Sequence, residues 1–320
     1  MDSKHDINFS STADHIYKAA EMTPKNILRS LIGNTIKKRR PGSTVAYSLA
    51  RHIVMAYENH DVNMETNGEN WLQGKLGERG PVTAVDVGAN KGEWAIGLLQ
   101  RVKDCRVYCY EPIPSTFAEL RQEVTDPRAT LINKALSYQA ATISFNAAID
   151  NHYISSIYDV KTWAPDTRIE KISVEAVTGD DEFSRLGLEN LTIIKVDAEG
   201  HDAEVISGFT NTLAERRVEF IQFEYNAFTL LGKQSLRAFY EILGELYVIC
   251  RLLPAGLEAT GYHTNIDNFT QSNWVAVRND IIDGELVAMF RMGVAHGLPG
   301  AALAKQLVNH PRIRGALGLE

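Results

Sequence analysis

From residue 82 onward, short apolar runs alternate with segments of helical periodicity. The runs expected to form strands are 82–87, 105–110, 129–133, 191–196, 218–224, 247–252 and 273–277. The segments expected to form the intervening helices are 91–102, 114–124, 203–213 and 235–246. Strands that alternate with helices favour a parallel sheet covered on both faces. The sequence therefore predicts a doubly wound α/β fold with a seven-stranded, mostly parallel sheet.

Three segments depart from this alternation. Residues 138–185 are expected to form a cap inserted into the sheet domain, which spans 81–280. Residues 1–80 are predicted to be a mostly helical arm that contacts the substrate or a second copy of the chain, and residues 281–320 a helical tail. Apolar residues recur at helical spacing over 45–57. Neither end segment carries a recognisable site, so the chemistry is expected in the sheet domain.

Composition limits the classes of function that the chain can have. The formal net charge of −7 argues against a general nucleic-acid surface. One basic cluster, 37–40, is interpreted either as a solvated helix end or as a contact for an anionic substrate, a membrane surface or a partner. The sequence shows neither a membrane-spanning run nor a secretion signal, and three cysteines are too few for a disulfide framework. We expect a cytoplasmic protein.

The first strand leads into a glycine-containing turn, DVGANKG at 86–92. Gly88 permits a tight turn, and Gly92 permits close packing of the next helix. A dinucleotide site needs a further glycine near the pyrophosphate, but that position is Asn90. Asp86 places a carboxylate at the strand end, and Glu111 follows the second strand where such folds bind ribose hydroxyls. The pattern indicates a nucleoside ligand without a diphosphate.

Five segments together resemble the FkbM-type methyltransferase family. They are DVGANKG at 86–92, YEP at 110–112, LINKALS at 131–137, KVDAEG at 195–200 and FE at 223–224. The resemblance covers roughly 67–278 and implies a Rossmann-like class I methyltransferase fold. It also implies S-adenosylmethionine as methyl donor and a hydroxyl of a sugar, surface glycan or natural product as acceptor.

The resemblance assigns roles to residues of the first half of the sheet. It implies that Asp86, Gly88 and Ala89 line the methionine part of the cofactor, next to Asn90 in the same loop. Glu111 is expected to hold the ribose hydroxyls. Asn133 and Ala135, both in the third of these segments, are expected to lie near the adenine.

The densest ionisable cluster follows the fourth strand, KVDAEGHD at 195–202. Lys195 and Asp197 share one face of the strand, because side chains alternate between faces. We expect Asp197 to contact the cofactor or the acceptor hydroxyl, and Glu199, Lys195 or His201 to handle the proton. A structural ion pair and an acidic helix start are the alternative interpretation of this cluster.

Two further possibilities stay open. Asp197, Glu224 and Asn226 could provide oxygen ligands to magnesium, although the family resemblance requires no metal. A nicotinamide-dependent oxidoreductase or a non-catalytic nucleotide-binding scaffold could use the same fold. The segment DAEG at 197–200 replaces the Asn/Asp-Pro-Pro-aromatic segment typical of amino-methylating enzymes on nucleic acid. We therefore expect a small-molecule or glycan acceptor, no nucleic acid, and possible homo-oligomerisation.

Overall fold

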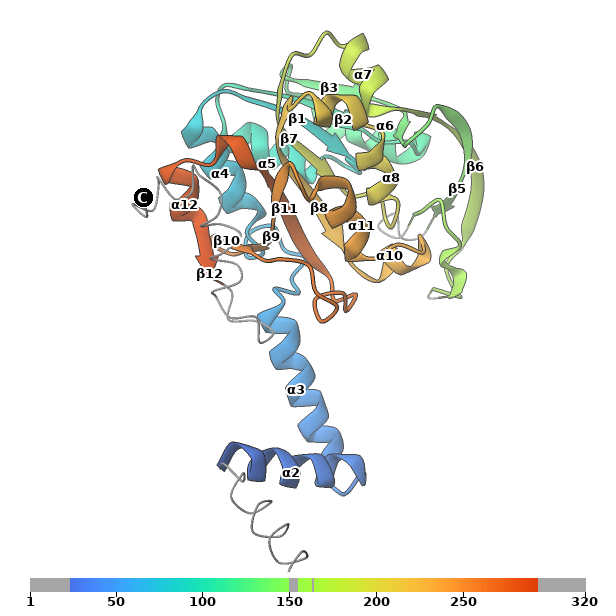
Figure 1. The fold of residues 1–320 in the computed structure, drawn as a ribbon. Helices are drawn as coiled ribbons and strands as arrows, with labels where there is room; N and C mark the ends of the chain where they lie inside the picture. The colour runs from blue at the N-terminus through green and yellow to red at the C-terminus, as the bar shows by residue number, and fades with distance from the viewer. Residues whose placement is uncertain (1–23, 150–154, 163, 293–320) are drawn as a thin grey trace, which may run out of the picture. The chain divides into compact units, whose positions relative to one another are not determined.

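The computed structural model describes residues 24–149, 155–162 and 164–292. It divides the chain into two compact units, Met1–Tyr57 and Glu58–Glu320. The helical arm expected over residues 1–80 is therefore divided between the two units. Residues 58–80 belong to the larger unit because α4 packs against α5 in that unit (Figure 1).

The described part of the first unit is a pair of helices, α2 (Pro24–Lys37) and α3 (Ser43–Tyr57). A short turn that contains Pro41 and Gly42 separates them, and Gly42 has a φ of +88°. Arg39, in the left-handed region with a φ of +50°, ends α2, and Pro41 disfavours a helical conformation of the residue before it.

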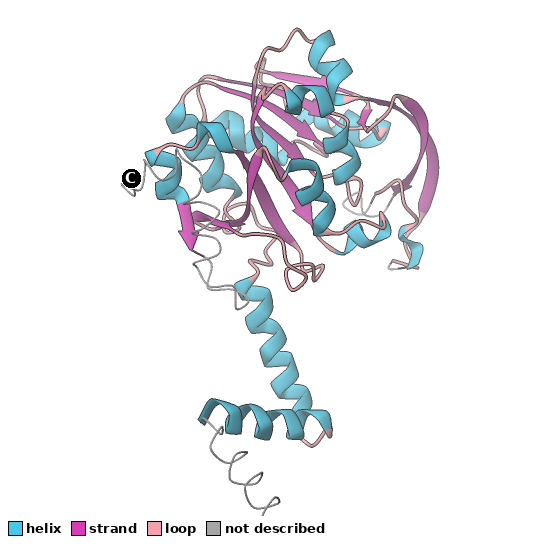
Figure 2. Ribbon diagram, in the orientation of Figure 1, coloured by secondary structure: helices cyan, strands magenta, loops and turns pink. Residues whose placement is uncertain are grey.

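The second unit is built on a mixed sheet (Figure 2). Its described strands are β1 (Val82–Val87), β2 (Cys105–Tyr110), β3 (Ala129–Ile132), β7 (Leu191–Val196), β8 (Val218–Tyr225), β9 (Tyr247–Leu253), β10 (Gly256–Ala259), β11 (Ser272–Arg278) and β12 (Phe290–Met292). They lie in the order β12-β10-β9-β11-β8-β7-β1-β2-β3. The strands from β3 to β8 pair in parallel, whereas β11 pairs antiparallel with both β8 and β9. This arrangement confirms the predicted α/β class with a mostly parallel sheet.

The predicted count of seven strands is wrong, since the described sheet has nine. The seven expected strands are all present, and β10 and β12 extend the edge beyond β9. β10 forms a hairpin with β9, and β12 pairs with β10 in parallel. Both added strands have at most four residues, too few to show a strand periodicity.

Helices cover both faces of the main sheet. The described helices of this unit are α4 (Glu69–Arg79), α5 (Glu93–Arg101), α6 (Pro114–Glu123), α7 (Gly179–Arg185), α8 (Asp202–Ser207), α9 (Thr210–Ala214), α10 (Ala227–Leu231), α11 (Leu236–Leu243) and α12 (Gly284–Met289). One core cluster contains side chains of α4, α5, α6 and α12, and the other contains side chains of α7, α8, α9 and α11. Neighbouring residues of β1 contribute to opposite clusters, Ala84 to the first and Val85 to the second, as strand alternation requires.

The helix expected over 203–213 is two helices, α8 and α9, separated at Gly208. A Cβ at Gly208 would collide with the carbonyl oxygen of Ser137, so this glycine permits a close backbone contact.

The insertion between β3 and β7 forms a second sheet. Its strands are β4 (Ala135–Leu136), β5 (Ala141–Ala148) and β6 (Ile169–Val177), in the order β4-β6-β5. A 3₁₀ turn, η2 (Val160–Thr162), lies between β5 and β6. Apolar side chains of this small sheet, including Phe145 and Val174, form a core of their own. The cap expected over 138–185 therefore includes an ordered sheet.

Of the helical tail expected over 281–320, the described part contains η3 (Asn279–Ile281), α12 and β12. The remainder lies outside the described residues. No described helix combines the length and the apolar character that crossing a lipid bilayer requires.

Candidate active site

The carboxyl ends of β1, β2, β7 and β8 place the candidate residues at one edge of the main sheet. Asp86 pairs across the strands with Lys195, and Lys195 pairs with Gln222, so these side chains form one row on the same face. Glu111 directly follows β2, and Asp197 directly follows β7. Ligands of open α/β sheets bind at this edge, where the strand order changes direction.

The loop after β1 is held against the ends of β2 and β7. The amides of Gly88 and Ala89 donate to the carbonyl oxygen of Tyr110 at 3.0 and 2.9 Å. Gly88 has a φ of +72°, and a Cβ there would collide with the carbonyl oxygen of Asp197. Asn90 also has a positive φ, +50°, a conformation that asparagine tolerates better than most residues. Only glycine fits the first of these positions.

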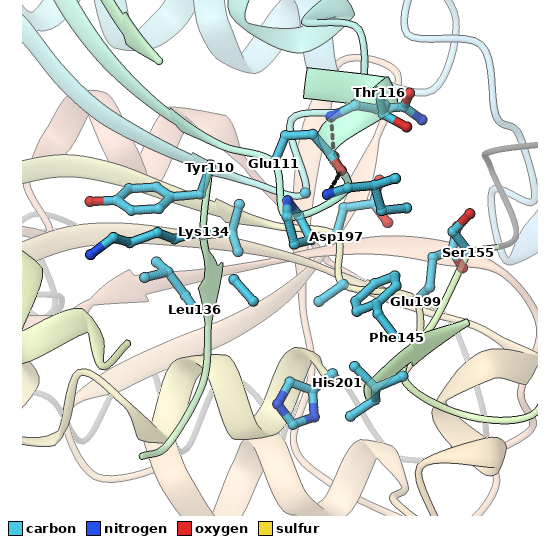
Figure 3. A pocket seen from close by; sticks show the side chains of 18 of the residues that line it. Tyr110, Glu111, Thr116, Lys134, Leu136, Phe145, Ser155, Asp197, Glu199 and His201 are labelled. Carbon is cyan, nitrogen blue, oxygen red and sulfur yellow. Dashed lines mark hydrogen bonds between the residues drawn. The ribbon is translucent and has the colours of Figure 1, made fainter. Parts of the chain in front are cut away.

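Glu111 connects the glycine loop to the start of α6 (Figure 3). Its carboxylate accepts hydrogen bonds from the amides of Asn90, at 3.1 Å, and Ile113, at 2.8 Å. Burial raises the pKa of Glu111 to about 7, although these two hydrogen bonds act in the opposite direction. Asn133 steadies the same segment, because its Nδ2 donates to the carbonyl oxygens of Glu111 and Pro112 at 2.8 and 3.1 Å.

A first cavity extends from the glycine loop to the small sheet, with a free volume of about 740 Å³ that includes space open to solvent. Its lining residues are Val87, Gly88, Asn90, Tyr110, Glu111, Pro112, Ile113, Thr116, Lys134, Ala135, Leu136, Ile143, Phe145, Ser155, Ile157, Asp197, Ala198, Glu199 and His201. The carboxylate of Glu111 suits ribose hydroxyls, and apolar walls from Leu136 and Phe145 suit an adenine ring. The cavity therefore fits the nucleoside part of S-adenosylmethionine.

Lys195 lies between two carboxylates at the same edge of the sheet. Its Nζ is 3.2 Å from Oδ2 of Asp197 and 3.6 Å from Oδ1 of Asp86. Burial alone would lower the pKa of Lys195, but the charges of Asp197 and Asp86 outweigh burial and raise it above its ordinary value. Burial raises the pKa of Asp86 to about 6, with Lys195 acting against it. Lys195 therefore carries a positive charge and is unsuited to accept a proton.

A second cavity adjoins the first, with a free volume of about 1310 Å³ by the same measure. Its lining residues are Val62, Met64, Asn67, Glu69, Gly88, Ala89, Asn90, Glu93, Trp94, Lys195, Asp197, Glu199, Glu224, Asn226, Phe228, Gln271 and Asn273. The two cavities share four residues. These are Gly88, Asn90, Asp197 and Glu199. The two cavities therefore border each other at this junction.

Three carboxylates converge at the junction. One oxygen each of Asp197, Glu199 and Glu224 lies within 4.8 Å of the others. Burial, followed by the charges of Asp197 and Glu224, raises the pKa of Glu199 well above its usual value. Glu199 also has a positive φ of +47°, and its buried Oε2 has no hydrogen-bond partner among the described residues. Such backbone strain in a non-glycine residue is typical of functional sites.

The oxygen set that could hold a cation differs from the set expected from the sequence. Asn226 was expected beside Asp197 and Glu224, but its Oδ1 accepts the amide of Phe228 at 2.7 Å and caps α10. Its Nδ2 donates to Glu224 at 2.6 Å. Asn226 thus offers an N–H group to the cluster, and Glu199 takes the third oxygen position.

His201 lines only the first cavity. Its Nε2 lies 2.8 Å from the Oγ of Ser137, and its Nδ1 lies 3.5 Å from the hydroxyl of Tyr158 and 3.7 Å from Glu204. Burial lowers the pKa of His201, with the charge of Glu204 acting against it. Burial therefore favours the neutral form of this histidine, which faces the first cavity.

The other predicted residues fall into distinct places. Ala135 lines the first cavity and Ala89 the second. Asp86 and Asn133 line neither of these cavities, and Asp86 has no exposed surface. Asp86 lies next to Lys195, and Asn133 donates a hydrogen bond to the main chain of Glu111, so each contacts the site through another residue.

Sequence reasoning did not identify the wall that α4 and α5 contribute. Glu69 lines the second cavity and accepts hydrogen bonds from Gln222 and Asn67, both at 2.8 Å. Trp94, in the first turn of α5, lines the same cavity. Asn67-Gly68-Glu69 begins the stretch that resembles the family and lies in the arm expected to contact the substrate, but nothing in one sequence shows that Glu69 reaches the carboxyl edge of the sheet.

A mostly parallel sheet with a cavity at its carboxyl edge, joined to a second cavity at an acidic junction, is typical of enzymes that bind a nucleoside-containing cofactor. Residues 86–262 match the model of the Methyltransferase FkbM domain, which is more than half of the chain. The chain belongs to this family, and the protein is a methyltransferase.

Two curated relatives share part of this chain. It is 28% identical over 191 residues to the 2-O-methyltransferase NoeI of Sinorhizobium fredii, covering 54% of this chain and 75% of the relative. It is 28% identical over 148 residues to the hexuronic acid methyltransferase AglP of Haloferax volcanii, covering 44% of this chain and 55% of the relative. Among solved structures, an O-methyltransferase from Bacillus cereus matches with a TM-score of 0.39 and 13% identity, over 74% of this chain and 91% of the other.

Proposed function

We propose that the protein transfers the methyl group of S-adenosylmethionine to a hydroxyl group of a sugar, either in a glycan or in a natural product. The observation that carries this proposal is the junction of the two cavities at Gly88, Asn90, Asp197 and Glu199. A donor in the first cavity and an acceptor in the second would be held at attack distance, which supplies most of the acceleration of a displacement reaction. The names of the two curated relatives support a sugar acceptor.

The first cavity would hold the cofactor. Glu111 would accept hydrogen bonds from the ribose hydroxyls, and Ala135 would lie beside the adenine. The glycine loop from Gly88 to Asn90 would lie against the methionine part, with Asp86 and Lys195 beneath it. When bound, S-adenosylmethionine supplies a methyl group that is activated by a positively charged sulfur.

Glu199 is the residue best placed to take the proton of the acceptor hydroxyl. It lines both cavities, and burial shifts its pKa from the usual value of a glutamate toward neutral pH. A general base is most effective when its pKa lies near the working pH. Of the other two candidates, Lys195 is kept protonated by its carboxylate partners, and His201 lines only the nucleoside cavity. Asp197 would position Lys195 and contact the reactants at the junction.

The charge of the second cavity favours an uncharged sugar. Five of its described lining residues are acidic: Glu69, Glu93, Asp197, Glu199 and Glu224. Lys195 is the single lysine or arginine among the described residues that line this cavity, and two carboxylates already flank it. A carboxylate on the acceptor would meet no unpaired lysine or arginine among the described lining residues, and the acidic residues that are ionised would repel it. Side-chain amides on the same wall can bind sugar hydroxyls instead.

Binding and turnover measurements test these proposals. Calorimetry should detect binding of S-adenosylhomocysteine and no binding of NADH, which separates a methyltransferase from an oxidoreductase. Turnover is then assayed by mass spectrometry with methyl glycosides of neutral hexoses and 6-deoxyhexoses, and with the matching glucuronosides. We expect one added methyl on a neutral sugar. Methylation of the glucuronoside at an equal rate would refute the neutral acceptor only, whereas bound cofactor with no sugar methylated would refute the sugar acceptor.

We place the protein in the cytoplasm, because its three cysteines are buried and free, as in a reducing compartment. The proposal includes a homo-oligomer. It does not include a nucleic-acid partner, because the net charge of the chain is −7.

A further inference from the structure

Residues 24–57, which form the two described helices of the first unit and are called the arm from here on, carry a charge opposite to that of the protein as a whole. Residues 24–57 contain no aspartate or glutamate, although the chain has a net charge of −7. The basic residues of this segment are Lys25, Arg29, Lys37, Lys38, Arg39, Arg40 and Arg51. Four of them are consecutive and exposed, at the turn between α2 and α3. This segment is therefore a concentrated positive surface with no role in the site described above.

α3 carries an apolar stripe that is exposed. Val45, Leu49 and Ile53 follow one another at a spacing of four residues, and their exposed fractions are 72%, 62% and 61%. At 100° per residue, Ala46, Ala50, Val54 and the two tyrosines Tyr47 and Tyr57 extend this face. Thr44, Ser48 and Arg51 lie on the other side of the helix together with Met55, and His52 borders the stripe beside Val45. Exposure of so many large apolar side chains on one helix indicates a surface that is covered by a partner.

We propose that α3 and the basic turn before it bind the surface of a bilayer that contains anionic lipid. The apolar stripe would lie among the upper acyl chains, while Lys37 to Arg40 would contact lipid phosphates. Helices that combine an apolar face with lysine and arginine lie in the plane of the interface. Tyrosine side chains, here Tyr47 and Tyr57, favour the same depth in a membrane.

The charge of the arm distinguishes this partner from a second copy of the chain. Two arms that pack against each other would bring two basic clusters into one assembly, with no acidic residue in 24–57 to neutralise them. An anionic lipid surface neutralises them directly, and each lysine or arginine near such a surface strengthens binding. α3 has 15 residues, about 22 Å of helix, which is shorter than the hydrocarbon core of a bilayer. The arm would therefore lie on the membrane.

Vesicle sedimentation of the full chain tests this proposal. Vesicles of equal parts phosphatidylglycerol and phosphatidylcholine should sediment most of the protein, vesicles of phosphatidylcholine alone should sediment little, and high salt should release it. The double substitution Lys38→Glu with Arg39→Glu should weaken binding at least about tenfold. The pair Leu49→Ser with Ile53→Ser should weaken it to a similar degree.

The double substitution Lys103→Glu with Arg106→Glu is a matched control, because it reverses two exposed positive charges in the other unit. It should bind vesicles like the unaltered protein. All variants should bind S-adenosylhomocysteine normally, and circular dichroism should show unchanged helix content. Equal binding to both kinds of vesicle, or full binding by the arm variants, would overturn the proposal. A dimer in light scattering that Leu49→Ser with Ile53→Ser dissociates, without vesicle binding, would assign the stripe to a second copy.

Discussion

Lys195 and Asp86 occupy paired positions on adjacent parallel strands, and the ammonium nitrogen lies 3.6 Å from the carboxylate. Asp86 has no exposed surface and Lys195 is only 8% exposed. The carboxylate oxygens of Asp86 have no hydrogen-bond partner among the described residues, so Lys195 provides the main compensation for its charge.

Removing Lys195 should therefore destabilise the fold. We expect Lys195→Met to lower the free energy of unfolding by roughly 3 kcal/mol at pH 8, because it leaves a buried charge unpaired. The pKa of Asp86 is already raised in the folded state, so the loss should shrink as the pH falls and Asp86 takes up a proton. Urea titration at several pH values measures it. Adding Asp86→Asn should recover most of the loss at pH 8; a double variant less stable than Lys195→Met would contradict this account.

Cofactor affinity should depend on the ionisation of Glu111. Burial raises its pKa to about 7, and ribose hydroxyls donate to the ionised form. The affinity for S-adenosylhomocysteine should therefore rise about tenfold between pH 6 and pH 8 and then level off. Glu111→Gln should bind more weakly at pH 8, by about tenfold or more, and show little pH dependence. Calorimetry gives both values, and an unchanged pH profile in this variant would assign the titration to another group.

Loss of the carboxylate of Glu199 should reduce the chemical step selectively. We expect Glu199→Gln to lower kcat by about 10²–10⁴-fold with little change in the affinity for the cofactor. His201→Asn should reduce kcat less than about tenfold, because this ring lies on the nucleoside side. The exposed Glu123, at the end of α6, provides a matched control as Glu123→Gln.

The pH dependence of kcat should identify the same carboxylate. Because burial and the neighbouring acids raise the pKa of Glu199, kcat should rise with pH through a value well above that of a free glutamate. Full activity of Glu199→Gln would transfer the role of base to Asp197.

Chelation should leave the activity intact. Three carboxylates lie close enough for a metal, but Asn226 turns an N–H group toward them, and Lys195 already neutralises part of their charge. We expect the rate in excess EDTA to stay within about twofold of the untreated rate. A loss of activity that Mg²⁺ restores would show that the acidic junction holds an essential cation.

Much of the site could be predicted because strand ends in a parallel sheet meet at one edge. Asp86 lies at the end of one strand that the apolar pattern identifies, and Glu111 and Asp197 directly follow two others, so their proximity follows from topology. The direction of a side chain after the strand has ended does not follow from periodicity. His201 lies only four residues after Asp197, yet the local turn directs it to the nucleoside cavity.

Other features depend on contacts between distant segments. Glu69 reaches the site because Gln222 and Asn67 hold its carboxylate, and no local pattern encodes that contact. The break between α8 and α9 depends on the carbonyl of Ser137 approaching Gly208. The extra strands β10 and β12 were missed because short segments owe their conformation to the edge with which they pair.

The absence of a side chain at Gly88 lets the loop after β1 rest on the main chain of Asp197. If the cofactor and the acceptor bind as proposed, main-chain atoms at Gly88 and Asp197 would help to set the distance between them. Replacing the amides and carboxylates farther along the acceptor wall could change which sugar enters while leaving the reacting atoms aligned. Engineering of acceptor choice in this enzyme should therefore begin at Gln271 and Asn273 and leave residue 88 untouched.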